Sequence, residues 1–401
     1  MSAPLSFIKL TFLIAILAAV GQMTQTMYVP SMGYMAHEFH VSAASMQAVM
    51  ACYLIPYGLS QFIYGPLSDR FGRRPIILVG LSIYITGSVI ALFSHNFSLF
   101  LVGSFIQGMG IGCGGAMART LTRDCFSGAQ LHKVNSLISM CLMFSPLVAP
   151  LLGGYLTEAF NWRGSYLFLA LFSIGVTIIM FTHMKETLPK ESRRYDSVST
   201  SYRYVLSSRQ FQGYLLCLVA TFAGVALFEA AAGVLLAGKL KLAATTVSLL
   251  FIVPIPGYLL GAAMSSWVAS RHSEKRALNF GLVAIAIGSL VIFIPGLFGY
   301  TNALTLVGGA TIYFLGAGVL FPAATTGAIS PFPYHAGTAG AILGGFQNFG
   351  AGLATLVAAM IPAQNQLPLG ALMLTMSLLA VIGLHRVNKT PISPDSLGSA
   401  V

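Results

Sequence analysis

The stretch GPLSDRFGRRP, residues 65–75, separates two long apolar runs of the 401-residue chain. Gly65, Pro66 and Gly72 are residue types that permit a tight turn between two helices. Asp69 can cap a helix, or pair with the neighbouring arginines when such a loop packs against other helices. We therefore expect a short, charged connection between two helices at this place.

Charge is scarce in the sequence around this loop. Asp, Glu, Lys and Arg together make up 8% of the residues, whereas soluble domains carry roughly 25%. Hydrophobic residues make up 56% of the chain, which leaves too little polar surface to cover a globule of this size. The composition excludes a soluble protein and indicates a membrane protein.

Twelve apolar runs have about the 20 residues that cross a hydrocarbon core of roughly 30 Å. Their approximate limits are 7–30, 43–65, 75–94, 97–118, 135–156, 164–184, 212–237, 244–269, 277–296, 303–328, 338–361 and 367–385. Because hydrocarbon holds no water for backbone groups, these runs must be helices. The sequence predicts an all-α membrane protein with twelve transmembrane helices.

Basic residues mark one side of this arrangement. With the N-terminus placed inside, 18 of the 21 Lys and Arg residues fall in inside loops or tails, and three fall outside. Cytoplasmic loops are enriched in Lys and Arg, so we expect both termini to be cytoplasmic. The net charge of +11 is then a sign of topology and not of a nucleic-acid partner.

The longest hydrophilic stretch divides the predicted spans six and six, which is the plan of a transporter built from paired repeats. We expect an N-terminal six-helix bundle over residues 1–184 and a cytoplasmic central loop over 185–211. A C-terminal six-helix bundle with a short cytoplasmic tail would follow over 212–401.

The ordered residues of the 65–75 loop resemble the signature loop of the major facilitator superfamily. Residues 145–154, SPLVAPLLGG, look like the P-x-x-G-G motif of the drug:proton antiporters in that superfamily, with Ala149 where Gly is usual. Nearly the whole chain is similar to the Bcr/CflA-like branch of these antiporters. The further matching stretches are VGQMTQT (20–26), MARTL (117–121), NWR (161–163), FEA (228–230) and GTAGA (337–341).

The resemblance implies a multi-pass exporter of the bacterial inner membrane that confers antibiotic resistance. Such a protein exchanges protons for hydrophobic or amphipathic, often cationic, drugs by alternating access. The proton gradient drives the transport, so we expect no cofactor. The expected partners are small substrates, protons and membrane lipid, and the expected state is a monomer.

A conformational gate is expected at the inner ends of the spans, where a charge cluster would hold one conformation and break when the halves rock. Its expected residues are Gly65, Asp69, Arg70, Gly72, Arg73, Arg74, Arg119 and Asp124. Arg119 and Asp124 could pair with each other or with Asp69 and Arg70. An ordinary solvated helix end is the alternative for Arg119 and Asp124.

The antiporter-like motif is rich in residues that bend helices. Pro146, Pro150, Gly153 and Gly154 would kink their helix and let another backbone approach closely. Ordinary packing of small residues is the alternative. In a neighbouring span, the position three before Gln107, which is Arg in many antiporters, is Ser104.

Placing the ten acidic residues leaves a single one inside a predicted span, Glu229. A carboxylate at membrane depth is costly unless it faces an aqueous cavity, has a partner or takes up a proton. Competition between a proton and a cationic substrate for one carboxylate is a physical basis for exchange. We expect Glu229 to couple transport to protons; a protonated Glu that only packs against a neighbouring helix is the alternative.

A substrate cavity near the midplane should be mostly apolar, with a few polar groups and aromatic faces that accept flat or cationic molecules. The expected lining residues are Gln22, Gln25, Thr26, Tyr53, Tyr57, Gln61 and Gln347, with Asn348 as a further candidate. Hydrogen bonds between helices are the alternative for these side chains.

Other functions have weaker support. The eight histidines lie in loops or at span ends, and the five cysteines form no metal-binding pattern, so we expect no metal site. The string GIGCGG, residues 110–115, lies inside an apolar run and indicates helix packing rather than dinucleotide binding. The nearest alternative is a proton-coupled exporter of one small metabolite, such as a sugar or an amino acid; an enzyme or a channel is more remote.

Overall fold

The computed structural model describes residues 7–126, 128–188, 198–271, 273–332, 335–362 and 364–388. Helices and short turns make up these residues, and none of them lies in a strand. The all-α fold expected from the sequence is therefore confirmed for the described part of the chain.

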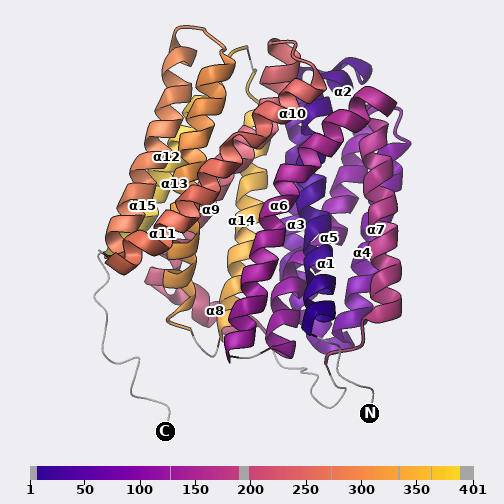
Figure 1. Ribbon diagram of the computed structural model, residues 1–401, viewed down its shortest axis with the longest axis vertical. Coiled ribbons are helices and arrows are strands. Elements are labelled where there is room, and N and C mark those ends of the chain that lie inside the picture. The colour runs from indigo at the N-terminus through magenta and orange to yellow at the C-terminus, as the bar shows by residue number, and fades with distance from the viewer. Residues whose placement is uncertain are drawn as a thin grey trace.

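The first group of helices ends before the central hydrophilic stretch. It comprises α1 (Phe7–Met27), the short helix η1 (Val29–Ser31), α2 (Met32–Glu38), α3 (Ala43–Phe71), α4 (Arg73–Leu92), α5 (Phe97–Cys125), α6 (Gly128–Phe160) and α7 (Arg163–His183). Figure 1 shows this group, in indigo to magenta, on the right of the molecule.

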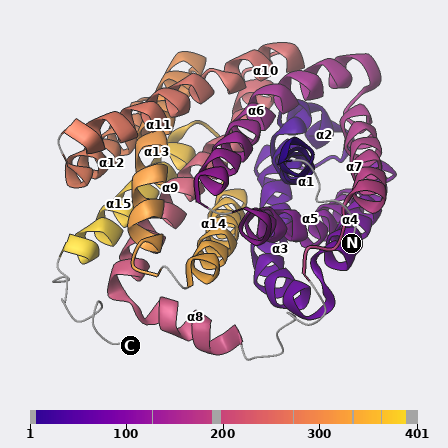
Figure 2. The same ribbon diagram turned by 60° about the horizontal axis from the view of Figure 1, so that its bottom comes forward.

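The second group stands beside the first, and Figure 2 shows the two from their lower end. It comprises α8 (Val198–Ser207), α9 (Arg209–Gly233), the π-helical turn η3 (Val234–Lys239), α10 (Ala244–Ile252), α11 (Pro254–Arg271), α12 (Glu274–Leu297), α13 (Ala303–Ile329), α14 (Ala336–Ala359) and α15 (Leu367–Asn388). The helix α8 lies inside the stretch 185–211 that was predicted as a loop, and α9 begins at Arg209 rather than at residue 212. The three-part division of the chain itself stays a prediction.

Polar caps define where several helices begin. The side chains of Ser42, Asn96, Ser208 and Ser273 accept hydrogen bonds from backbone N–H groups in the first turns of α3, α5, α9 and α12, respectively. These bonds satisfy donors that the first turn of a helix leaves unpaired. The boundaries therefore follow from residues that the sequence places just before the apolar runs.

The turn between α3 and α4 is formed by Gly72 alone, which has φ = +104°. We expected Gly65 and Pro66 to contribute to this turn, but α3 continues through Pro66 to Phe71. An additional turn and a half of helix thus carries Asp69 beyond the predicted end of the span. Of the two glycines in the 65–75 loop, only Gly72 adopts a backbone conformation that other residues rarely accept.

Two opposite ends of the molecule can be named by their charged residues. At the Asp69 end, Asp69 and Asp124 pair with Arg73, and the ring of Phe7 at the start of α1 lies 5.4 Å from the ring of Phe126. At the Glu38 end, Glu38 accepts hydrogen bonds from Trp162 and Arg163 across 2.5 Å and 2.6 Å. Each end therefore collects loops that are far apart in the sequence.

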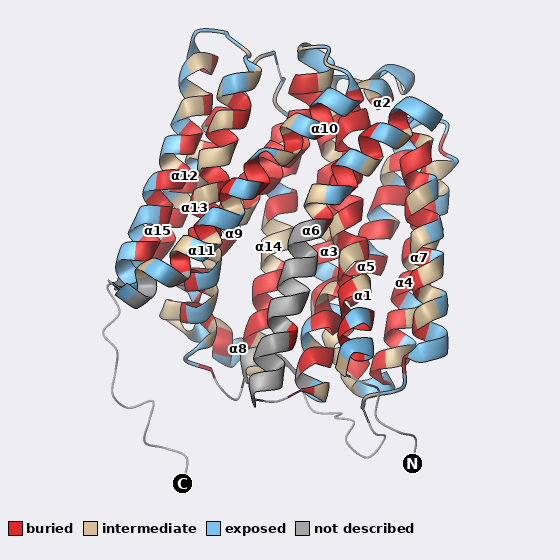
Figure 3. Ribbon diagram, viewed as in Figure 1, coloured by how far each residue is buried: buried red, intermediate tan, exposed pale blue. Residues whose placement is uncertain are grey.

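Ten helical segments of the described chain are long and apolar enough to cross a membrane. Figure 3 shows exposed residues along the outer faces of the bundle, and many of the exposed side chains are large and apolar, such as Phe12, Ile178 and Leu260. Apolar exposure on this scale suits contact with lipid. The helices α3 and α6, of 29 and 33 residues, are not among the ten, so the total of twelve spans stays a prediction.

Close backbone contacts hold neighbouring helices together. A Cβ atom on Gly110 of α5 would lie 2.3 Å from the backbone nitrogen of Tyr84 in α4, and one on Gly58 of α3 would lie 2.4 Å from that of Phe349 in α14. Small residues at such contacts let helices pack by van der Waals contact where lipid supplies no hydrophobic attraction between them. The GIGCGG string thus packs helices, as the sequence indicated.

This packing predicts a large difference between two Gly→Ala substitutions. We expect Gly110→Ala to lower the midpoint of thermal unfolding in detergent, because overpacking at a rigid contact costs about 1–3 kcal/mol. Gly175→Ala in α7 is the matched control, since nothing lies within 4 Å of its Cβ position; it should leave the midpoint unchanged or raise it slightly. Equal midpoints for the two variants would contradict the close contact of α4 with α5.

Candidate functional site

A cavity of about 600 Å³ lies between the two groups of helices. Its wall is formed by α1, α3, α5 and α6 of the first group and by α9, α11, α13 and α14 of the second. Such a volume is typical of sites for drug-sized molecules. The lining residues that the sequence singled out are Gln22, Gln25, Tyr57, Gln61, Arg119, Pro146, Glu229, Gln347 and Asn348.

Much of the second group's wall is apolar or aromatic, and the sequence did not single these residues out. They are Phe222, Val225, Ile255, Tyr258, Phe314 and Phe321, with Thr325 beside them. In a chain that is 56% hydrophobic, an apolar side chain that faces a cavity looks the same in sequence as one that faces lipid. No local pattern could have identified them.

Two residues expected in the cavity lie elsewhere. Tyr53 is fully buried and donates a hydrogen bond to the carbonyl oxygen of Gly21, 2.9 Å away, which ties α3 to α1. Thr26 is also buried, and its hydroxyl turns back to the carbonyl oxygen of Gln22 in its own helix. Of the two tyrosines of α3 that were expected in the cavity, only Tyr57 lines it.

Glu229 lies in α9 at the junction of the two groups and lines the cavity. Its side chain is almost fully buried, and one carboxylate oxygen, Oε2, accepts a hydrogen bond of 2.6 Å from Nε2 of Gln25 in α1. This is a direct polar contact between the first and second groups. Salt bridges in the described chain involve Arg73 and Arg163, so no described cation pairs with this carboxylate.

Arg119 lines the same cavity, nearer the Asp69 end. Its Nη1 lies 3.5 Å from Oε1 of Gln61, and its guanidinium crosses from α5 to rest on Gly344 of α14. We expected Arg119 in the charge cluster with Asp124, but no salt bridge of the described residues includes it. The reason is direction, since Arg119 faces the cavity and Asp124, five residues further along α5, faces the loop.

Glu229 and Arg119 lie at different depths in the cavity. Tyr53 contacts α1 at Gly21, one turn before Gln25, whereas Gln61 approaches Arg119. Eight residues of α3 separate Tyr53 from Gln61, or about 12 Å of helix rise. Glu229 therefore lies towards the Glu38 end of the cavity and Arg119 towards the Asp69 end.

The charge cluster of the 65–75 loop is centred on Arg73. Its Nη1 donates to Asp69 Oδ1 at 2.5 Å and to the hydroxyl of Ser68 at 2.6 Å, and its Nε donates to Asp124 Oδ2 at 2.9 Å. The Arg73 side chain is 6% exposed, whereas Asp69 is 42% exposed. The planar guanidinium thus joins the ends of α3, α4 and α5.

Glu186 completes this cluster, although no motif in the sequence pointed to this residue. Its carboxylate accepts hydrogen bonds from the backbone N–H groups of Arg73 and Arg74, at 2.9 Å and 3.2 Å. It therefore caps the start of α4 from the segment that follows α7, where a negative charge also suits the helix dipole.

Arg74 in turn donates to the carbonyl oxygen of Phe181 at 2.6 Å. Arg70 lies over the ring of Phe71, 5.4 Å from its centroid.

The antiporter-like motif of α6 lies where the two groups meet near the Glu38 end. A Cβ atom on Gly153 would lie 1.8 Å from the carbonyl oxygen of Met27, and one on Gly154 would lie 2.1 Å from Oγ of Ser248 in α10. The Ser248 hydroxyl donates to the carbonyl oxygen of Pro150 at 2.8 Å. The helix α6 runs unbroken through Pro146 and Pro150.

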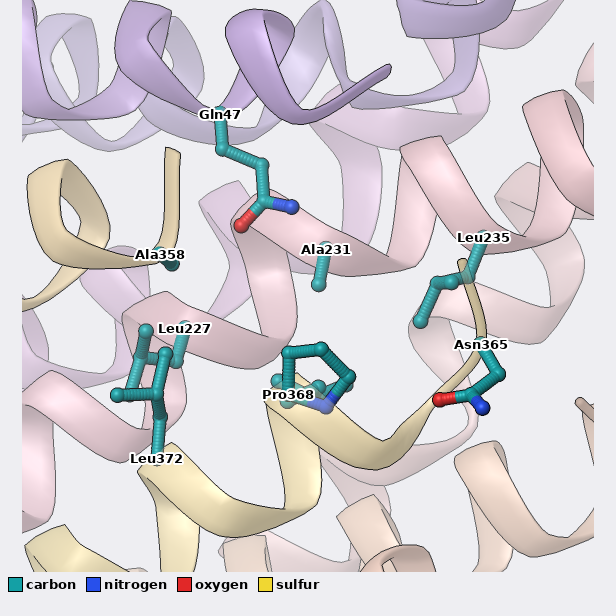
Figure 4. Close-up of a pocket in the computed structure, with 9 residues that line it drawn as sticks. Gln47, Leu227, Ala231, Leu235, Ala358, Asn365, Pro368 and Leu372 are labelled. Atoms are coloured by element: carbon teal, nitrogen blue, oxygen red, sulfur yellow. The ribbon is translucent and has the colours of Figure 1, made fainter. Parts of the chain in front are cut away.

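The Glu38 end of the cavity is closed by such contacts. A Cβ atom on Gly233 would lie 2.2 Å from the carbonyl oxygen of Val29. Figure 4 shows a pocket of only about 10 Å³ in this region, between Gln47 of α3 and the residues Ala231, Asn365 and Pro368 of the second group. That volume holds about one water molecule, so this pocket is too small for a drug-sized ligand.

The position that is Arg in many antiporters has no charge in this fold. Ser104 is buried and donates to the carbonyl oxygen of Phe100, while Gln107 donates to the hydroxyl of Ser88 at 2.9 Å. Neutral hydrogen bonds between α4 and α5 thus occupy the place. A proton relay through a charged group at this position is excluded.

Comparisons with known proteins identify relatives over almost the whole chain. The family model of the Major Facilitator Superfamily matches residues 14–355. Multidrug resistance protein D of Escherichia coli is 44% identical over 377 residues, which cover 94% of each chain. A bicyclomycin resistance protein homolog of Haemophilus influenzae is 25% identical over 339 residues, which cover 83% of this chain and 85% of the relative.

The fold also resembles a solved structure. A crystal structure of a D-xylose-proton symporter superposes with a TM-score of 0.72, covering 94% of this chain and 97% of the symporter chain. The two sequences are 14% identical, so this likeness shows the fold alone.

The geometry around Arg73 predicts that lysine cannot replace it. We expect Arg73→Lys to lower the thermal stability of the purified protein. The measure is the temperature of heating at which the monodisperse peak falls to half of its initial size. One ammonium cannot make the separate bonds to Asp69, Asp124 and Ser68, and each lost bond to a charged group is worth about 1.5–3 kcal/mol. Arg276→Lys, at an exposed position of α12, is the matched control and should behave as the wild type. An unaltered Arg73→Lys variant would show that the cluster does not hold α3, α4 and α5 together.

Proposed function

The chain belongs to the Major Facilitator Superfamily, and from this we propose that it exports hydrophobic or amphipathic drugs, often cationic ones, in exchange for protons. It is a multi-pass membrane protein and a transporter rather than an enzyme. The names of its relatives support drug efflux, since multidrug and bicyclomycin resistance are among them. The aromatic and apolar cavity wall suits substrates of this class.

The observation that carries the coupling part of this proposal is the position of Glu229. It is a buried acid that lines the cavity, accepts a hydrogen bond from the uncharged amide of Gln25, and forms no salt bridge with a described cation. An uncompensated carboxylate in an apolar place needs either a proton or a cationic ligand. Binding of one therefore favours release of the other, which is the exchange that an antiporter requires.

The cavity and its seal suggest one step of an alternating-access cycle. The Glu38 end is closed by close packing of backbones, while the cavity wall reaches towards the Asp69 end at Thr122 and Thr325. In the proposal this is the state that receives substrate from the cytoplasm. Separation of Gly154 and Gly233 from their contacts in the other group then opens the opposite end, as the halves rock about the site.

The proposal includes an orientation and a location. The Asp69 end carries the predicted inside loops, so it faces the cytoplasm of a bacterial cell, with the protein in the inner membrane and both termini cytoplasmic. Asp69, Arg73, Asp124 and Glu186 form the conformational gate at that face. The protein acts as a monomer without a cofactor, and the proton gradient supplies the energy.

The test of this function is Glu229→Gln in proteoliposomes. We expect the variant to lose proton-driven export of a cationic dye, with at least about a tenfold drop in initial rate, because an amide neither takes up a proton nor pairs with a cation. Exchange of dye across the membrane without a proton gradient, measured in the same vesicles, shows whether the variant still binds dye and changes conformation. Glu274→Gln, at an exposed position of α12, is the matched control and should transport as the wild type does. Proton-driven export by Glu229→Gln at matched protein content would refute the role of this carboxylate.

A further inference from the structure

The amide of Gln25 has one half of its hydrogen-bonding capacity unused. Nε2 donates to Glu229 at 2.6 Å, but Oε1 is buried and has no hydrogen-bond partner among the described residues. The Gln25 side chain is only 2% exposed. A buried acceptor without a donor destabilises a protein, so this oxygen requires a further explanation.

The direction of the amide follows from its neighbour. An ionised carboxylate only accepts hydrogen bonds, so the –NH₂ side of Gln25 must face Glu229 and the carbonyl side must face away. Both residues line the cavity. The site therefore offers two kinds of acceptor to a ligand, the amide oxygen on α1 and the carboxylate on α9.

A ligand that satisfies both acceptors needs a positive charge and at least two N–H groups. We propose that the Gln25–Glu229 pair selects primary and secondary ammonium ions among the cationic substrates. One N–H donates to Gln25 Oε1 and a second to the Glu229 carboxylate. The inference rests on the proposed function and adds the substrate class that this site prefers.

The rest of the cavity wall determines the body of such a substrate. Phe222, Phe314 and Tyr258 contribute aromatic surface to the same cavity, which favours an apolar or aromatic group attached to the ammonium. A quaternary ammonium of the same size also pairs with the carboxylate and the aromatic faces. It has no N–H, however, so Gln25 Oε1 stays unpaired when it is bound.

This difference can be measured with one scaffold. The probes are 4-phenylbutylamine and its N-methyl, N,N-dimethyl and N,N,N-trimethyl derivatives. The first three are cationic at pH 7 because alkyl amines have pKa values near that of lysine, and the trimethyl derivative has a permanent charge. Apolar burial alone predicts tighter binding with each added methyl group. We expect the opposite order for the purified wild-type protein, with the two members that have at least two N–H groups binding about tenfold or more tightly than the trimethyl member.

Two substitutions locate the source of the selectivity. Gln25→Met keeps the length of the side chain but removes the acceptor, so the preference for primary over quaternary ammonium should fall to within about threefold. Gln212→Met is the matched control, since Gln212 lies at an exposed position of α9 and is not among the residues that line the cavity; it should keep the order found for the wild type. Retention of the full preference by Gln25→Met would overturn the assignment.

The wild-type series needs no substitution, so the proposal stays testable even if a variant fails to fold. Equal affinities for all four probes, or the order expected from apolar burial, would overturn it. Proton-driven export of the trimethyl probe in proteoliposomes would then still support the proposed function. Conversely, the expected binding order without proton-driven export of any probe would refute the exporter and leave the recognition of N–H groups intact.

Discussion

Hydrocarbon offers no hydrogen bond to a polar group, and the placement of polar atoms in this fold follows from that constraint. Buried hydroxyl groups within the spans bond to backbone carbonyls one turn earlier in their own helices, as Thr24, Ser88, Ser173 and Ser289 do. Charged side chains collect at the two ends of the bundle or border the cavity. Glu229 and Arg119, the charged groups that border the cavity, therefore mark the candidate functional site.

The same solvent removes the hydrophobic attraction between helices, so contacts depend on how closely two backbones approach. Gly110 serves this purpose within the first group, and Gly58, Gly154 and Gly233 do so where the two groups meet. At the Glu38 end the two groups also share hydrogen bonds, from the Ser248 hydroxyl to the carbonyl oxygen of Pro150 and from the Thr245 backbone N–H to the Glu158 carboxylate. The ion pairs of the Arg73 cluster at the opposite end lie within one group of helices.

Features that depend on a scarce residue type could be predicted from the sequence. Charge is rare, so Glu229 could be found by elimination, and the ordered loop around Asp69 predicted the Arg73 cluster and its turn at Gly72. The direction in which a side chain points from its helix was harder to predict, because α3 and α5 have apolar residues on every face. Arg119 and Asp124 lie five residues apart on α5 yet face the cavity and the loop respectively. Tyr53 and Tyr57 lie one turn apart on the same face of α3, with both hydroxyls near Gly21, yet only Tyr57 lines the cavity. Glu186 could be identified only once the fold placed the end of α7 beside the start of α4.

The two charges that border the cavity do not neutralise each other. Glu229 contacts Gln25 of α1, one turn beyond Gly21, and Gly21 is bonded to Tyr53 of α3. Arg119 lies beside Gln61, which is about 12 Å of helix rise further along α3 than Tyr53. Ser104, at the position where many antiporters place an arginine, and Gln107 three residues later are uncharged and are bonded within the first group. The carboxylate therefore has no counterion among the described residues, and the charge it needs must come from something that enters the cavity. A resident arginine at hydrogen-bonding distance would hold Glu229 ionised in every state and would remove its dependence on proton or substrate. The uncharged partner Gln25 permits the carboxylate to change its charge within one transport cycle.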